Sequence, residues 1–391
     1  MSTRKTTKAA KHSQGGLLIW HGMSCSGLWR LFRSKPSLHW SRLGRILSLP
    51  VSGVFNSVMK RAESLVYGKR VRETKVEHPP LFVFGYWRSG TTLLQNLLSH
   101  DPQFQHLGLY RALFPWHFLL TEKAVTKLTA PFVPKNRPMD NMSVHWDAPQ
   151  EDDVSLCIMS NVSPINLLSH PTDFSHFWKA LDFERLEPEE RQRWKDSLAL
   201  LVKKLTFTSP KRIMMKSPFH TYRIPELLEL FPDARFLYIH RNPYNIFRSA
   251  LHLRRRMIEE NTLGRSVFDG NEEQVIESYK FGFEKYERDR LLVPEEHRHE
   301  ICYEELEQDP IGVLRKAYAG LDLPGFEALE KELEPQVESL KRYKKNEFND
   351  DPYWVDRVYN ELKPAFDRFG YDKPEVTAAP ASEKEATSSA S

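Results

Sequence analysis

The chain has 391 residues, of which 40% are hydrophobic and 28% are charged, so it can build one large core or two smaller ones. Its three cysteines, Cys25, Cys157 and Cys302, lie far apart. Their spacing excludes a disulfide framework and a cysteine metal site, and we expect a reducing, cytoplasmic location. The net charge of +4 is unevenly distributed along the chain. Residues 1–77 hold 15 Lys and Arg but only 3 Asp and Glu. Of the totals of 56 basic and 52 acidic residues, the rest of the chain therefore holds 41 basic and 49 acidic residues.

Residues 1–77 are predicted to form a basic N-terminal arm. A polar start, MSTRKTTKAAKHSQ, is expected to be disordered, and the segments LWRLF and SRLGRILSLPVSGVF then mix apolar with basic residues. No run reaches the roughly 20 apolar residues of a spanning helix, and no secretory signal is clear. Three interpretations stay open: peripheral binding to an anionic membrane, which we favour, an ordinary packed helix, or a transit or nucleic-acid-binding arm. We expect no nucleic-acid partner.

The next part of the chain, residues 78–372, has the pattern of a doubly wound α/β domain. Short apolar runs that predict buried strands alternate with helical patterns, which indicates a mainly parallel sheet flanked by helices. An irregular segment rich in Pro, His and aromatic residues, 104–175, is expected to cover the acceptor side of a site, and the low-complexity tail 373–391 is expected to be disordered. The predicted strands are LFVF, RIMMKS, ARFLYIH and HEICYEEL.

A glycine-bearing loop, FGYWRSGTT, follows the first predicted strand. Gly85 and Gly90 have the spacing of a Walker A loop, but Thr91 and Thr92 stand where that motif needs Lys and then Ser or Thr. The cation lies inside the loop instead, at Arg88, and the two strand ends RIMMKS and ARFLYIH carry no acid for magnesium. The loop therefore favours a small anion bound without metal, the alternative being a turn that only caps a helix.

A second motif, HRNPYNIFRSA, follows the strand ARFLYIH. Arg241 ends the strand, Asn242 is a plausible N-cap with Pro243 at the first helical position, and Ser249 comes eight residues after Arg241. We expect Arg241 and Ser249 to close on one phosphate, unless they are only solvated residues.

Together the two motifs resemble those of the sulfotransferases that use 3′-phosphoadenosine 5′-phosphosulfate (PAPS), over about residues 80–320. The similarity is greatest to the branch with Arg in the first loop, which includes tyrosylprotein sulfotransferases and many bacterial proteins. It implies a P-loop-like fold, a phosphosulfate in the first loop and no metal. The implied contacts are Arg88, Ser89, Gly90, Thr91 and Thr92 for the phosphosulfate, and Arg241 and Ser249 for the 3′-phosphate.

The same resemblance implies that Lys216 faces the sulfonate bridge and that Tyr303 lies near the adenosine. It does not supply the general base, because the family's acidic and histidine positions fall near Leu109 and Tyr110 and on Pro218. The residues leave three candidates for the base: His220, Glu151 and His117.

The implied reaction is in-line transfer of a sulfonate group to a hydroxyl or amine, with Arg88 and Lys216 neutralising the leaving oxygen. Aromatic residues between 104 and 146 could line a pocket for a sugar, a phenol, a lipid headgroup or a peptide. Two other functions remain open at this point: a P-loop kinase with a degenerate loop, and a non-catalytic protein that binds a nucleotide or a membrane.

Overall fold

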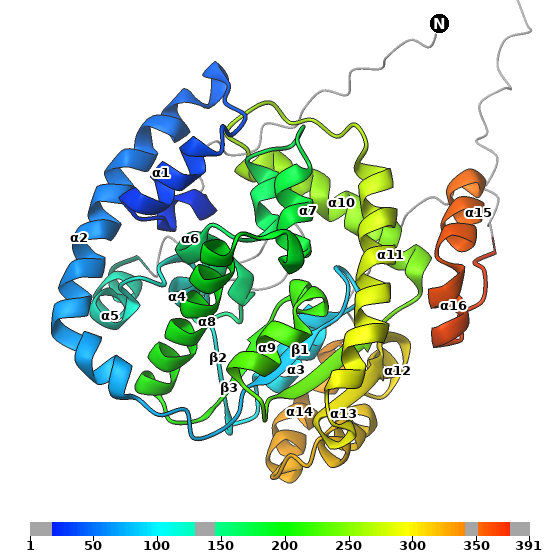
Figure 1. Cartoon of the computed structure of the whole chain (residues 1–391). Coiled ribbons are helices and arrows are strands. Elements are labelled where there is room, and N and C mark those ends of the chain that lie inside the picture. The colour runs from blue at the N-terminus through cyan, green and yellow to red at the C-terminus, as the bar shows by residue number, and fades with distance from the viewer. Residues whose placement is uncertain (1–17, 130–144, 341–350, 376–391) are drawn as a thin grey trace, which may run out of the picture.

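A parallel sheet of five strands forms the centre of the computed structural model, which describes residues 18–129, 145–340 and 351–375 (Figure 1). The strand order is β2-β3-β1-β4-β5. All four residues of β1 are buried, as expected for a strand covered on both faces. The strands are β1 (Leu81–Phe84), β2 (Phe104–His106), β3 (Arg212–Lys216), β4 (Arg235–His240) and β5 (Arg298–Cys302).

Successive side chains of β1 point to opposite faces of the sheet and belong to two separate hydrophobic clusters. Phe82 and Phe84 belong to a cluster with residues of α5 (Phe118–Thr129), α8 (Pro188–Thr208) and α9 (Ile224–Leu230). Leu81 and Val83 belong to the other, with residues of α3 (Thr91–Leu98), α13 (Pro310–Gly320) and α14 (Phe326–Leu340). Helices on both faces of a parallel sheet confirm the predicted fold class.

Strand β1 lies between β3 and β4, and this position decides where a ligand can bind. The chain leaves β1 for the edge strand β2, returns through β3, and then places β4 on the other side of β1. In register, Val83 lies opposite Lys216 and Phe84 opposite Tyr238. The carboxyl ends of β1, β3 and β4 therefore meet at a topological switch point, where such sheets bind ligands.

Two parts of the chain differ from the sequence-based expectation. The segment 104–175 was expected to be irregular, but it holds the edge strand β2, a strand too short to show a period of two. It also holds α4 (Leu109–Leu113), α5, α6 (Asp152–Ser160), the 3₁₀ helix η4 (Pro164–Leu168) and part of α7 (Ser175–Leu181). The predicted strand HEICYEEL ends at Cys302, and α12 (Tyr303–Gln308) begins at once.

The remaining helices follow the predicted order. In α10 (Pro243–Asn261), the expected cap forms, because Asn242 Oδ1 accepts hydrogen bonds from the backbone N–H of Tyr244 at 3.0 Å and of Asn245 at 3.4 Å. Helix α11 (Asn271–Asp289) precedes β5, and α15 (Pro352–Glu361) and α16 (Lys363–Phe369) follow α14.

Two N-terminal helices, α1 (Cys25–Arg33) and α2 (Leu43–Glu73), pack on the domain, and α2 runs along one edge of the molecule (Figure 1). The inner side of α2 carries polar anchors. Asn56 Nδ2 donates to the carbonyl oxygens of His21 and Met23 at 2.6 and 2.8 Å. Glu63 forms a buried ion pair with Lys204 of α8, with 2.5 Å between Oε1 and Nζ.

The outer side of α2 is apolar and exposed. Its residues follow helical spacing and continue onto the segment before it, so they form one stripe rather than scattered side chains. No helix in the described part of the chain is long and apolar enough to span a membrane. The stripe, which we call the α2 face, consists of Trp40, Leu43, Leu47, Val51, Val54, Val58, Leu65 and Val66, each more than half exposed.

The Glu63–Lys204 pair gives a test of how α2 is held. Glu63→Ala should lower the free energy of unfolding by about 3–5 kcal/mol, because Lys204 would remain as a buried and unpaired charge. Denaturant titration measures this value. Glu73→Ala, which removes an exposed carboxylate 3.9 Å from Lys69 on the same helix, is the control and should cost less than about 1 kcal/mol. A similar small loss in both variants would contradict the role of the buried pair.

Candidate active site

The loop between β1 and α3 is tightly shaped by its neighbours. A side chain at Gly85 would place its Cβ 2.2 Å from the carbonyl oxygen of Ile239, and one at Gly90 would place it 2.3 Å from the Tyr303 ring. Gly90 also has a φ of 108°, and Arg88 adopts a left-handed φ of 70°. Glycine at these two positions is therefore required by the close approach of β4 and α12.

This loop has unused hydrogen-bonding capacity for an anion. Gly90 is the N-cap of α3 and offers no capping side chain, so the first N–H groups of the helix have no side-chain acceptor there. The Ser89 hydroxyl is buried and has no partner among the described residues. N–H groups at a helix N-terminus together with a free hydroxyl suit a phosphate or sulfate group.

The second motif lies directly against the loop. Arg88 Nε donates to Ser249 Oγ at 2.9 Å, and Arg241 Nη1 donates to the backbone oxygen of Arg88 at 3.2 Å. The Arg241 guanidinium lies 4.1 Å from the centre of the Tyr303 ring, and burial raises the pKa of Tyr303 to about 12. The sequence led us to expect Arg241 and Ser249 to close on one phosphate. It did not anticipate that Arg88 contacts both residues.

Lys216 reaches the same loop from the end of β3. The residue is 2% exposed, and its Nζ donates to Thr92 Oγ1 at 3.4 Å and to Glu151 Oε1 at 2.8 Å. Glu151 immediately precedes α6, and 30% of its side chain is exposed. Strand β3, the first turn of α3 and the start of α6 thus converge on one ammonium group.

Three consecutive acids at the start of α6 each pair with a basic side chain from the segment that begins at Lys216. This segment includes the 3₁₀ helix η6 (Pro218–Tyr222). None of these pairs was predicted from the sequence, although the run of three acids, Glu151 to Asp153, was readable there. The pairs are Glu151 with Lys216 at 2.8 Å, Asp152 with His220 at 2.9 Å, and Asp153 with Arg223 at 2.9 Å.

The second and third pairs lie deeper than the first. Both side chains of each pair are fully buried, and the His220 ring packs edge-on against Phe82 with 5.1 Å between centroids. Burial raises the pKa of Asp153, although Arg223 opposes that shift. Glu151 is consequently the acid of this series that remains accessible from the loop side.

His117, the third candidate base, lies at the contact with α2. Its Nε2 shares a hydrogen bond with Asn56 Oδ1 at 3.1 Å, and its Nδ1 shares one with Thr121 Oγ1 at 2.8 Å. Burial lowers the pKa of His117 to about 4. Its hydrogen-bond partners come from α2 and α5 and not from the loop.

Comparisons with known proteins agree with this geometry. The profile described as "Sulfotransferase family" matches residues 79–328. Omega-hydroxy-beta-dihydromenaquinone-9 sulfotransferase Stf3 from Mycobacterium bovis is 33% identical over 378 residues, which cover 95% of each chain. Among solved structures, sulfotransferase STF9 from Mycobacterium avium has a TM-score of 0.63 at 20% identity and covers 90% of this chain and 92% of its own. For STF1 from Mycobacterium tuberculosis the values are 0.60, 16%, 86% and 90%.

The close contact between Gly90 and Tyr303 predicts a selective loss of binding. Gly90→Ala should weaken the affinity for 3′-phosphoadenosine 5′-phosphate at least about tenfold, because the new Cβ displaces the ring or the loop. Calorimetric titration measures this affinity. Gly270→Ala is the matched control, since Gly270 has a φ of 78° and its Cβ would meet only Phe174 at 3.7 Å. Both variants should lose roughly 1–2 kcal/mol of stability from the left-handed backbone. Equal nucleotide affinity in both variants would contradict the contact's role.

Proposed function

Because the chain belongs to the sulfotransferase family and transfers a sulfonate group, we propose that it takes this group from PAPS and delivers it to a hydroxyl of a membrane lipid. The observation that carries the proposal is the convergence of Arg88, Lys216 and Glu151 around the phosphate loop. The donor site, the chemistry, the base and the acceptor are supported by different parts of the structure.

The donor site fits both phosphate groups of PAPS. In the proposal the loop from Arg88 to Thr92 holds the 5′-phosphosulfate through N–H groups and hydroxyls. Arg241 and Ser249 hold the 3′-phosphate, since a guanidinium and a hydroxyl beside the loop can share its oxygens. Tyr303, whose ring lies under Arg241, is placed to pack against the adenosine. PAPS supplies an activated sulfonate group, and the chain supplies the charges around it.

Two cations are available for the charge that develops during transfer. The acceptor oxygen forms a bond to sulfur while the bond from sulfur to the bridging phosphate oxygen breaks, and that bridging oxygen gains negative charge. Arg88 comes from the loop and Lys216 from β3, so they approach from different elements. Preorganised donors of this kind stabilise the transition state more than the ground state.

We assign the general base to Glu151 rather than to His220. A base must reach the proton of the acceptor hydroxyl, and Glu151 is partly exposed beside Lys216, whereas His220 is fully buried against Asp152. Glu151 Oε1 accepts a hydrogen bond from Lys216 Nζ at 2.8 Å, which holds the carboxylate beside the loop. His220 and Asp152 then position the start of α6, and with it Glu151.

This assignment predicts separate effects on turnover and on binding. Glu151→Gln should lower kcat by about 10²–10⁴-fold, because the amide cannot accept the proton. The affinity for 3′-phosphoadenosine 5′-phosphate should change less than about threefold, measured by calorimetry on the same preparation. Asp147→Asn, at an exposed acid in the segment before Glu151, is the control and should leave kcat unchanged. Normal turnover in Glu151→Gln would remove Glu151 from the mechanism.

A lipid acceptor is supported by one relative and by the surface of this chain. The relative that is 33% identical is named for its action on omega-hydroxy-beta-dihydromenaquinone-9, a lipid with a hydroxyl group. In the present chain, the apolar α2 face is larger than the scattered apolar residues that a soluble surface ordinarily shows. A sugar, phenol or peptide that is sulfated while hydroxylated lipids are not would overturn this part of the proposal.

Charge beside the α2 face favours an anionic membrane surface. Arg33, Lys35, Arg61, Lys69 and Arg70 are exposed on or near α1 and α2. Basic residues next to an apolar stripe bind anionic lipid headgroups while the stripe enters the boundary with the acyl chains. The α2 face would thus hold the enzyme where its acceptor is dissolved.

The α2 face can be tested apart from catalysis. The triple substitution Leu47→Glu, Val51→Glu and Val54→Glu should weaken binding to vesicles with anionic phospholipid at least about tenfold, because it removes apolar contact and adds negative charge. Vesicle sedimentation at low and high salt measures this. The pair Leu291→Glu and Leu292→Glu, at residues 67% and 58% exposed on another element, is the control and should bind like the wild type. Failure of the wild-type protein to bind such vesicles would refute the membrane contact.

A further inference from the structure

Gln95 is a buried amide on the helix that follows the phosphate loop, and the mechanism above gives it no role. It lies in α3, three residues after Thr92, and is 1% exposed. Its Nε2 donates a hydrogen bond to the backbone carbonyl oxygen of Gln150 at 3.0 Å. Its Oε1 is buried and has no hydrogen-bond partner among the residues that the structure describes. The side chain therefore makes one specific polar contact, and that contact is to the segment before α6.

This contact lies one peptide before the proposed base. The Gln150 carbonyl belongs to the peptide group that joins Gln150 to Glu151. The N–H of Gln150 is fixed as well, because it donates to the carbonyl oxygen of Leu107 at 2.9 Å. Glu151 is the N-cap of α6 and has an extended backbone, with a φ of −73° and a ψ of 130°. Where its carboxylate lies thus depends on how the preceding peptide is held.

Helix α3 connects this peptide to the donor site. Thr92 Oγ1, in the first turn, accepts a hydrogen bond from Lys216 Nζ at 3.4 Å. Gln95 is one turn further along and lies on the same side of the helix as Thr92. The same helix thus contacts Lys216 through its first turn and the peptide before Glu151 through its second. Its N-terminus is where the proposed function places the phosphosulfate.

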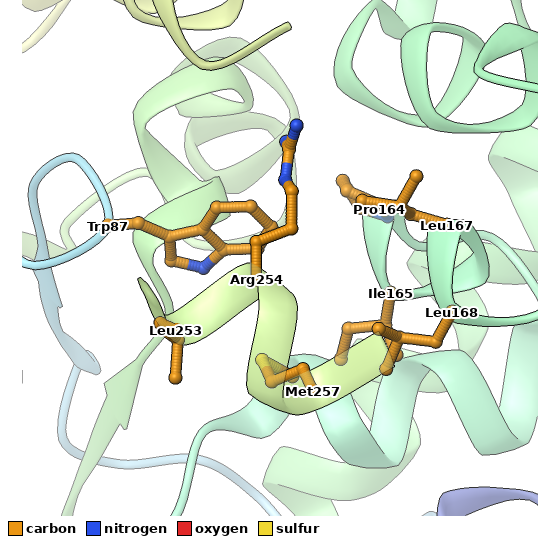
Figure 2. Close-up of a pocket in the computed structure, with 8 residues that line it drawn as sticks. All are labelled: Trp87, Pro164, Ile165, Leu167, Leu168, Leu253, Arg254 and Met257. Atoms are coloured by element: carbon orange, nitrogen blue, oxygen red, sulfur yellow. The ribbon is translucent and has the colours of Figure 1, made fainter. Parts of the chain in front are cut away.

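The space on the Trp87 side of the phosphate loop is filled. Figure 2 shows Trp87 and Arg254 on one side of a small cavity and the turn from Pro164 to Leu168 on the other. The volume of this cavity is about 10 Å³, which suffices for about one water molecule. An acceptor cannot bind there, whereas Glu151, with 30% of its side chain exposed, is accessible. The position of Glu151 then decides whether the proton of the acceptor can be removed.

A neutral donor suits the position of Gln95. Only the NH₂ end of an amide can donate to a carbonyl oxygen, so this contact fixes which way the amide points. A Lys or Arg at this place would compete with Lys216 for the Glu151 carboxylate. The amide instead holds the backbone and leaves the carboxylate to Lys216 and to the acceptor. Because a buried Oε1 without a partner is unfavourable, stability alone does not account for a glutamine here.

We propose that Gln95 is a positioning residue, which holds the peptide before Glu151 so that the carboxylate reaches the acceptor hydroxyl. The inference rests on the proposed function, which assigns the base to Glu151. It adds the contact that joins this base to the helix of the donor site. Asp152 and Asp153 fix the residues after Glu151, and Gln95 fixes the residue before it.

The test measures hydrolysis of PAPS to 3′-phosphoadenosine 5′-phosphate, in which water takes the place of the acceptor hydroxyl. Gln95→Met keeps the length of the side chain and removes the donor. It should lower kcat about 10- to 100-fold, since a misplacement of about 1 Å has an effect of this order. The affinity for 3′-phosphoadenosine 5′-phosphate should change less than about threefold. Gln103→Met is the matched control, because Gln103 Nε2 also donates to a carbonyl oxygen, that of Pro324 at 2.8 Å, and it should keep the wild-type kcat.

A double-mutant cycle tests whether Gln95 acts through Glu151. In the Glu151→Gln protein, the additional change Gln95→Met should lower the remaining turnover less than about threefold, because the group that it positions is no longer a base.

Hydrogen exchange gives a measurement that does not depend on activity. Backbone amides of residues 147–154 should exchange faster in Gln95→Met than in the wild-type protein, and at the wild-type rate in Gln103→Met. Gln95→Glu has the same shape but no N–H donor, so it should behave like Gln95→Met, and it decides the matter if Gln95→Met does not fold.

The results separate this inference from the proposed function. Wild-type kcat in Gln95→Met, together with a large loss in Glu151→Gln, would overturn the inference and leave the proposed base intact. An equal loss from Gln95→Met with and without Glu151→Gln would also overturn it, because Gln95 would then act by another route. Normal turnover in Glu151→Gln would instead contradict the proposed base. If the wild-type protein does not hydrolyse PAPS, the donor is in question, and unchanged hydrogen exchange in Gln95→Met would overturn the positioning role by itself.

Discussion

The three pairs between acids at the start of α6 and the side chains of Lys216, His220 and Arg223 are the interactions on which the site depends. Two of them, Asp152 with His220 and Asp153 with Arg223, are fully buried, so breaking either would leave a charged or polar group without compensation. Asp152 and Asp153 also lie in the first turn of α6, where negative charge is favourable. These constraints fix the start of α6 against the end of β3 and leave Glu151 beside Lys216 at the loop.

The position of β1 explains why the site can be assembled from distant parts of the chain. Strand β1 lies between β3 and β4, so Lys216, the loop and Arg241 all lie at the carboxyl ends of neighbouring strands. Lys216 ends β3 and Arg241 directly follows β4, so the separation of these two cations depends on the rigid sheet. Such preorganisation is what a transferred group with developing charge requires.

The N-terminal helices have two sides with different physical roles. The inner side of α2 holds the buried Glu63–Lys204 pair and the Asn56 hydrogen bonds, which resemble the interior of the domain. The outer side is apolar and exposed, and basic residues accompany it. In the proposed function the polar donor comes from solution and the acceptor from the membrane.

The sequence by itself determined the features that depend on local pattern. Apolar runs predicted four of the five strands, and the loop with Arg88 and the pair Arg241 and Ser249 were recognised because their spacing reflects a strand end followed by a helix. Only the tertiary structure decided which residues meet across long separations. It placed Glu151 against Lys216, 65 residues away, buried His220, and turned one side of α2 outward. The edge strand β2 was missed because three residues carry too little periodicity. The physical reason is the same in each case: burial and pairing of a side chain are set by the elements packed around it, and those elements come from distant parts of the chain.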